Sequence, residues 1–299
     1  MDTIRLGKTD LTVTRIGFGG IPIQRLSEKD AISVVRRCVD LGINFLDTAN
    51  AYSNSEERIG KAISGRYEGL IIATKSGARN PDRIKEHLEQ SLKMLQVDSI
   101  DLYQLHAIND FDAYNQVMNE RLDTMEEAKR VGKIKHIGIT SHNIDVAKEA
   151  VKSNRFETLM FPFNFITSEP EDQLLPLCKK HDVGFIAMKP MGGGMLEDAT
   201  IAFKYLLQFP DVVPIPGIEH LNEIDEIVEV VNGPRNMTEA EIARMQQLKD
   251  ELGTQFCRRC DYCRPCSVDI PISTVMVTPS FFKRLPPERI FSSWIGNLL

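Results

Sequence analysis

A regular alternation of two kinds of segment constrains the fold more than any other feature of this sequence. Short runs rich in Ile, Leu, Val and Phe, typical of buried strands, alternate with longer stretches whose apolar residues recur at helical spacing. We predict strands at residues 15–20, 44–47, 70–74, 100–105, 134–140, 158–161, 184–188 and 212–215. We predict helices at residues 28–41, 56–63, 82–96, 114–131, 144–153, 171–181, 198–209 and 221–231.

Each predicted strand is joined to the next by a predicted helix, as a parallel crossover requires. Eight such units match a closed (β/α)8 TIM barrel of the α/β class. The alternative is an open doubly wound sheet, which usually has about five or six strands and the glycine pattern GxGxxG after the first. No such pattern follows a predicted strand here, so we favour the barrel.

The two ends of the chain depart from the repeating pattern. Residues 3–14 alternate between polar and apolar around GKTD (residues 7–10), which predicts a β-hairpin at the start of the barrel. Residues 238–252 predict one more amphipathic helix. Its expected apolar face carries Ile242, Met245, Leu248 and Leu252. We therefore expect residues 1–253 to form the barrel and residues 254–299 to form a small cysteine-rich C-terminal appendage.

Composition narrows the class of partner. The formal net charge of −6 provides no basic surface for nucleic acid or for an anionic membrane. The N-terminus lacks the apolar core of a signal peptide, and no apolar run approaches the ~20 residues of a membrane span. We expect a cytoplasmic protein whose partner is a small molecule.

Four polar residues stand at or just after predicted strands: Asp47, Tyr52, Lys75 and His106. In a closed parallel barrel the carboxyl ends of the strands surround one cavity. We therefore expect these four side chains to converge there. Taken singly, each has an ordinary explanation: Asp47 and Lys75 as a structural ion pair, His106 as a satisfied polar group, and Tyr52 as a loop aromatic.

Together the four residues suit the reduction of a carbonyl. Hydride transfer leaves negative charge on the oxygen, which calls for a proton donor beside it. Tyr52 can be that donor if the ammonium of Lys75 stabilises its phenolate, because an unperturbed tyrosine titrates near ~10. Asp47 would balance the buried Lys75, and a neutral His106 would orient the carbonyl. No side chain supplies the hydride, so a nicotinamide cofactor is implied.

These residues closely resemble the signature of the aldo-keto reductases, with FLDTANAY (residues 45–52) followed by Lys75 and His106 at strand ends. The resemblance covers about residues 3–252 and includes four more motifs: GFGG (17–20), HIGIT (136–140), KPMGGG (189–194) and IPGIEH (215–220). It implies hydride transfer between NADP or NAD and an aldehyde or ketone, or the matching alcohol.

The resemblance also implies a dinucleotide over the barrel mouth. Thr140 and Ser141 would face its carboxamide, with Met160 where a glutamine is usual. The loop at residues 190–194 would offer exposed backbone N–H groups to the pyrophosphate, unless it is simply a tight turn. The predicted cofactor contacts are Gly20, Thr140, Ser141, Lys189, Pro190, Met191, Gly192, Gly194, Pro216, Gly217 and Glu226. Glu223 stands where an arginine usually binds a 2′-phosphate, which favours NADH or the use of both coenzymes.

A second motif lies in the appendage, where Cys257, Cys260, Cys263 and Cys266 follow one another at C-x2-C spacing. The first three repeat a bacterial ferredoxin pattern. Zinc also accepts four thiolates, but its sites usually separate two pairs by a longer loop. Thiols or disulfides without a metal are the third alternative. The stretch resembles a ferredoxin-like extension on one branch of the family, which implies a 4Fe-4S cluster and allows a redox partner protein.

Two rival functions stay open. One is a non-catalytic, cofactor-sensing or electron-transfer subunit that keeps the barrel. The other is a purely structural protein stapled by zinc.

Overall fold

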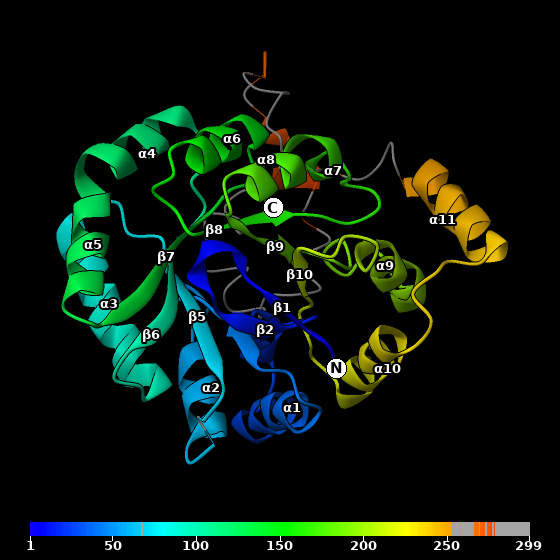
Figure 1. Ribbon diagram of the computed structural model, residues 1–299, viewed down its shortest axis with the longest axis horizontal. Helices are drawn as coiled ribbons and strands as arrows, with labels where there is room; N and C mark the ends of the chain where they lie inside the picture. Colours follow the sequence, from blue (N-terminus) through cyan, green and yellow to red (C-terminus); the bar gives the residue numbers. More distant parts are fainter. Residues whose placement is uncertain are drawn as a thin grey trace.

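Parallel strands form the centre of the fold, and helices surround them (Figure 1). The computed structural model describes residues 1–66, 68–252, 257, 266–268, 270–272, 274–276 and 278. The barrel strands are β3 (Phe18–Gly19), β4 (Phe45–Asp47), β5 (Ile71–Ser76), β6 (Ile100–Leu105), β7 (Ile134–Thr140), β8 (Thr158–Pro162), β9 (Gly184–Met188) and β10 (Val212–Ile215). Neighbouring strands pair in parallel in this sequence order.

Hydrogen bonds between the first and last strands close the sheet. The amide of Gly17 donates to the carbonyl of Pro214 at 2.9 Å, and that of Gly19 donates to Pro216 at 2.7 Å. A Cβ atom on Gly19 would lie 2.8 Å from the Pro216 oxygen, so only glycine allows this approach. The predicted (β/α)8 barrel is confirmed.

Helices cover the outside of the barrel. They are α1 (Glu28–Asp40), α2 (Ser55–Ile63), α3 (Pro81–Leu95), α4 (Phe111–Gln116), α5 (Leu122–Arg130), α6 (Ile144–Lys152), α7 (Pro170–Gln173), α8 (Leu175–Lys180), α9 (Ala199–Leu206), α10 (Leu221–Asn232) and α11 (Glu239–Leu252). Their starts follow local capping chemistry. The side chain of Ser27 accepts a hydrogen bond from the Asp30 amide before α1, and Asn80 does the same for Arg83 before α3.

Two predicted helices are each divided. The helix expected at residues 114–131 contains a π-helical turn, η3 (Val117–Arg121), between α4 and α5. The buried Arg121 ends this turn and donates to the carbonyl of Ala113 at 2.6 Å. The helix expected at 171–181 breaks between α7 and α8, where Pro176 provides no amide proton and its ring crowds the preceding turn.

The predicted hairpin is confirmed at the start of the chain. Strands β1 (Thr3–Arg5) and β2 (Thr12–Thr14) pair antiparallel on either side of the 3-10 turn η1 (Gly7–Thr9). Its buried residues Leu6 and Val13 pack with barrel-interior side chains. The hairpin therefore plugs one end of the barrel.

Helix α11 lies outside the ring of helices (Figure 1). Met245, Leu248 and Leu252 are partly buried against the core, as predicted, but Ile242 is 50% exposed. No described helix is both long and apolar enough to cross a membrane. The boundary at residue 253 adjoins residues outside the described part and stays a prediction.

Candidate active site

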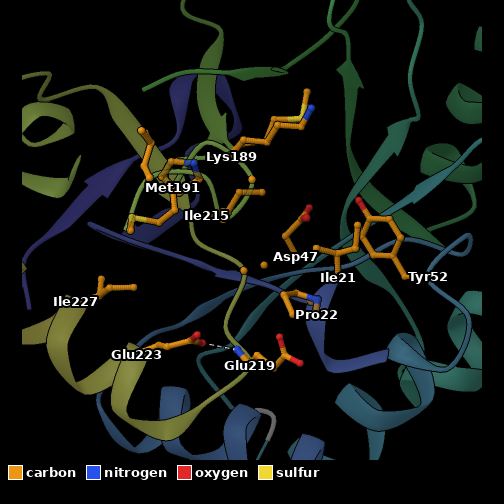
Figure 2. A pocket seen from close by; sticks show the side chains of 18 of the residues that line it. Ile21, Pro22, Asp47, Tyr52, Lys189, Met191, Ile215, Glu219, Glu223 and Ile227 are labelled. Atoms are coloured by element: carbon orange, nitrogen blue, oxygen red, sulfur yellow. Dashed lines mark hydrogen bonds between the residues drawn. The ribbon is translucent and has the colours of Figure 1, made fainter. Parts of the chain in front are cut away.

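The four predicted catalytic side chains line one cavity of about 680 Å³ at the carboxyl ends of the strands. Figure 2 shows Asp47 and Tyr52 on its wall. Asp47 ends β4, Lys75 is the penultimate residue of β5, and His106 directly follows β6. Tyr52 comes from the connection between β4 and α2. The barrel therefore brings together residues that lie up to 59 positions apart in the sequence (106 − 47).

Lys75 and Asp47 form a buried ion pair. The Lys75 Nζ atom lies 2.6 Å from Asp47 Oδ2 and also donates to the Thr48 carbonyl at 2.6 Å. Gln104 donates to the other carboxylate oxygen of Asp47 at 3.2 Å. Only 1% of Lys75 and 2% of Asp47 is exposed, so the pair is shielded from water and can act on its neighbours at close range.

The pKa values follow from this burial. Burial raises the pKa of Asp47, and the Lys75 ammonium opposes that rise. Burial lowers the pKa of Lys75, but the Asp47 carboxylate, and Tyr52 when it is a phenolate, outweigh it, so the pKa is raised overall. Lys75 therefore remains an ammonium at neutral pH.

Tyr52 and His106 face the same space as Lys75. Their rings are nearly perpendicular, with centroids 5.8 Å apart. Lys75 Nζ lies 5.2 Å from the centre of the Tyr52 ring. Burial and the Lys75 charge lower the pKa of His106 to about 3, so its ring is neutral at physiological pH. A neutral imidazole can donate one hydrogen bond and accept another.

The connection that carries Tyr52 is fastened at both ends. The Asn50 amide donates to the Lys75 carbonyl at 3.0 Å, and the Ser55 amide donates to the Tyr52 carbonyl at 2.8 Å. The buried hydroxyl of Ser55 donates to the Gly20 carbonyl at 2.8 Å and accepts from the Thr48 hydroxyl at 2.9 Å. These hydrogen bonds fasten the loop that carries Tyr52 to the carboxyl ends of β3 and β5.

Most of the predicted cofactor contacts line the same cavity. They are Gly20, Thr140, Lys189, Pro190, Met191, Gly194, Gly217 and Glu226. Ser141, Gly192 and Pro216 do not line it. Ser141 is buried and closes a turn with Asn143, and the carbonyl of Pro216 accepts the amide of Gly19 in the barrel seam.

The glycine loop is a tight turn. Gly192, Gly193 and Gly194 have positive φ angles of 55°, 83° and 82°. The Gly192 amide donates to the Lys189 carbonyl at 2.9 Å, and the Gly194 amide donates to Met191 at 2.8 Å. These two amides, which we expected to point at a pyrophosphate, are instead engaged inside the loop.

Several residues of the site were missed from the sequence. Gln104, which contacts Asp47 but does not line the cavity, could have been noticed because it is a polar residue within a buried strand. His142, whose Nε2 lies 3.0 Å from Lys189 Nζ, has no comparable signal. The other missed lining residues are Ile21, Pro22, Arg25, Met188, Leu196, Glu197, Ala199, Ile215 and Glu219.

Only two of the four predicted metal ligands lie within the described residues. Cys257 and Cys266 are half-buried, whereas Cys260 and Cys263 lie outside the described residues. Within the described ranges, no group of three or more His, Cys, Asp or Glu side chains is arranged to hold a metal ion. The cluster stays a prediction.

Comparison with known proteins identifies the family. The model of the aldo/keto reductase family matches residues 15–201. This chain belongs to the aldo/keto reductase family. The chain is 30% identical over 296 residues to the uncharacterized oxidoreductase YqkF of Bacillus subtilis. The match covers 81% of this chain and 94% of that protein.

Solved aldo/keto reductases share its fold. AKR11C1 from Bacillus halodurans, in its holo form, superposes with a TM-score of 0.73 at 28% identity, covering 83% of this chain and 96% of that one. An aldo/keto reductase from Klebsiella pneumoniae, solved in complex with NADP and acetate, has a TM-score of 0.70 at 21% identity, with coverage of 83% and 95%. The second likeness is one of fold alone.

Proposed function

We propose that this aldo/keto reductase transfers a hydride between a nicotinamide dinucleotide and an aldehyde or ketone, or the matching alcohol, with Tyr52 as the proton donor. The observation that carries the proposal is the position of the buried Lys75, which is paired with Asp47 and lies 5.2 Å from the ring of Tyr52. An ammonium so placed in a water-poor site stabilises the phenolate that remains after proton donation.

The cavity suits such a cofactor. Its volume of about 680 Å³ falls in the range of ligand pockets. Ile21, Met160 and Ile215 supply apolar wall for a ring, and Lys189 supplies a positive charge beside the glycine loop for a phosphate. When bound, the nicotinamide supplies or accepts the hydride.

The chain's own residues account for the remaining steps. The N–H of neutral His106 orients the carbonyl oxygen between His106 and Tyr52. The Tyr52 hydroxyl then gives its proton to the oxygen as negative charge develops there. Lys75 balances the phenolate, while Asp47 and Gln104 keep the ammonium in place. In the oxidative direction Tyr52 takes the proton back.

The Tyr52→Phe variant tests the proton-donor role. We expect kcat/KM for aldehyde or ketone reduction to fall by about 10²–10⁴-fold, because the general acid is lost. Coenzyme binding, followed by fluorescence, should persist. Tyr114→Phe is the matched control, since the Tyr114 hydroxyl donates to the Glu149 carbonyl and Tyr114 does not line the cavity.

The same assay separates the rival function. An unchanged rate in Tyr52→Phe would remove the proton-donor role. Coenzyme binding with no turnover across a broad panel of carbonyls and alcohols would favour the cofactor-sensing or electron-transfer subunit instead.

We also propose, from the sequence alone, that Cys257, Cys260, Cys263 and Cys266 bind a 4Fe-4S cluster, with zinc as the alternative. Iron, sulfide and zinc analysis of anaerobically purified protein distinguishes the two.

A further inference from the structure

The two ends of the cavity differ in charge. Tyr52 marks the reacting end, whereas Glu223 and Ile227, from the first turns of α10, lie on the opposite side (Figure 2). Lys75 lies beside Tyr52 at the reacting end. Of the charged side chains that the described structure places along the cavity, five are acidic and three are basic. The acidic ones are Asp47, Glu197, Glu219, Glu223 and Glu226.

Two of the three basic groups are already balanced. Lys75 is paired with Asp47, as described above. Arg25, at the end of the 3-10 turn η2 (Pro22–Arg25), forms an ion pair with Glu219 from the loop before α10. The two side chains are only 19% and 24% exposed, so this pair is partly shielded from solvent. Arg25 is therefore not available as an uncompensated positive charge.

Glu223 occupies the N-terminus of α10. Its Oε2 atom accepts the amide of Glu219 at 2.7 Å and the amide of His220 at 2.9 Å. A helix N-terminus usually attracts an anion. Here the helix fills that position with its own carboxylate, so an incoming phosphate would meet like charge instead of amide protons.

The dinucleotide has a defined direction if its nicotinamide lies beside Tyr52. The cavity continues from there along the glycine loop to Glu223, Glu226 and Ile227 of α10, which leaves that end for the adenosine. NADPH differs from NADH only by a phosphate on the adenosine ribose, which carries a charge of about −2. Opposition of like charges is an effective means of rejecting the wrong ligand.

We propose that the acidic end of this cavity excludes the ribose phosphate, so that the enzyme uses NADH in preference to NADPH. Glu219 and Glu223 are the discriminating residues: Glu219 neutralises Arg25, and Glu223 fills the helix N-terminus. The inference rests on the proposed function, because it takes the nicotinamide to lie beside Tyr52.

Fluorescence titration of the full-length protein with NADH and with NADPH measures the preference without needing a substrate. We expect the wild type to bind NADH at least about tenfold more tightly. Glu219→Gln should tighten NADPH binding by about tenfold and leave NADH nearly unchanged, because it frees Arg25. Glu223→Gln keeps a side-chain oxygen that can accept from the amides of Glu219 and His220, and it should also tighten NADPH binding. Added salt should shrink the wild-type preference.

Two further variants sharpen the test. Glu229→Gln, an exposed position on the same helix but outside the cavity, should change neither affinity. Adding Arg25→Met to Glu219→Gln should abolish the gain in NADPH binding. Equal or tighter NADPH binding by the wild type, or an unaltered ratio in both single variants, overturns the inference. If neither coenzyme binds, the proposed function itself fails.

Discussion

Lys75 and Asp47 depend on each other. Removing water from either charge costs several kcal/mol, and the close partner compensates, together with the amide of Gln104 and the carbonyl of Thr48. Loss of Asp47 would leave an unpaired buried ammonium, so a variant at Asp47 disturbs the fold as well as the chemistry. The chemical roles at this site are therefore better tested at Tyr52 and His106, which are less buried.

His106 provides a test by pH. Because burial and Lys75 lower its pKa from 6.5 to about 3, the ring should stay neutral well below pH 6. The unfolded chain binds this proton more readily, so this residue should reduce stability as the pH falls from 6.5 toward 3. We expect the NMR signals of the His106 ring, assigned with His106→Asn, to show no titration between about pH 8 and pH 5. A midpoint above about pH 5 would contradict this.

The connection between β4 and α2 shows how an element holds a reactive group. Gly20 must lack a side chain, because a Cβ atom there would lie 2.8 Å from the Ser55 hydroxyl oxygen. The close approach lets the hydroxyl of Ser55 link the end of β3 to the loop that carries Tyr52. The element is therefore positioned by a few buried polar contacts as well as by apolar packing.

Ser55→Ala tests this link. The change leaves the buried Gly20 carbonyl without its donor, and we expect the free energy of unfolding to fall by about 1–3 kcal/mol. Urea denaturation followed by circular dichroism measures it. Ser33→Ala is the matched control, because the exposed Ser33 hydroxyl bonds only a carbonyl of its own helix, and it should cost under about 0.5 kcal/mol. Equal effects of the two changes would argue against the link.

Closure of the barrel is a property of the whole molecule. The seam between β3 and β10 contains few strand hydrogen bonds, and Arg15 reinforces it from just before β3. Only 2% of Arg15 is exposed, and burial lowers its pKa. Its guanidinium donates, at 2.6 to 3.3 Å, to the carbonyls of Leu207, Phe209, Pro210 and Val212. One side chain therefore ties the first strand to the end of α9 and the start of β10.

Arg15→Met should destabilise the molecule by about 3 kcal/mol or more, since several buried carbonyls would lose their donor. Denaturation with guanidinium chloride, followed by far-ultraviolet circular dichroism, measures the loss in the free energy of unfolding. Arg36→Met is the control: Arg36 is exposed and makes one bond to the Ala62 carbonyl. A loss no larger than in the control would show that the seam does not depend on Arg15.

Much of the fold could be predicted because it is encoded locally. The apolar runs predicted β6, β7, β9 and β10 with the bounds that the structure shows. Helix starts such as the one at Ser27 follow from neighbouring capping residues. The four residues Asp47, Tyr52, Lys75 and His106 could be brought together in advance, because a parallel barrel gathers its strand ends at one rim whatever its exact register.

By itself, then, the sequence determined the order and type of the elements, the barrel, and the group of Asp47, Tyr52, Lys75 and His106. Only the tertiary structure decided that Gln104 supports Asp47, that Arg25 is balanced by Glu219, and that the amides of Gly192 and Gly194 are turned inward. The physical reason is distance along the chain: Arg25 and Glu219 are 194 residues apart. Such pairs depend on how loops meet once the barrel has closed, and no local periodicity records that.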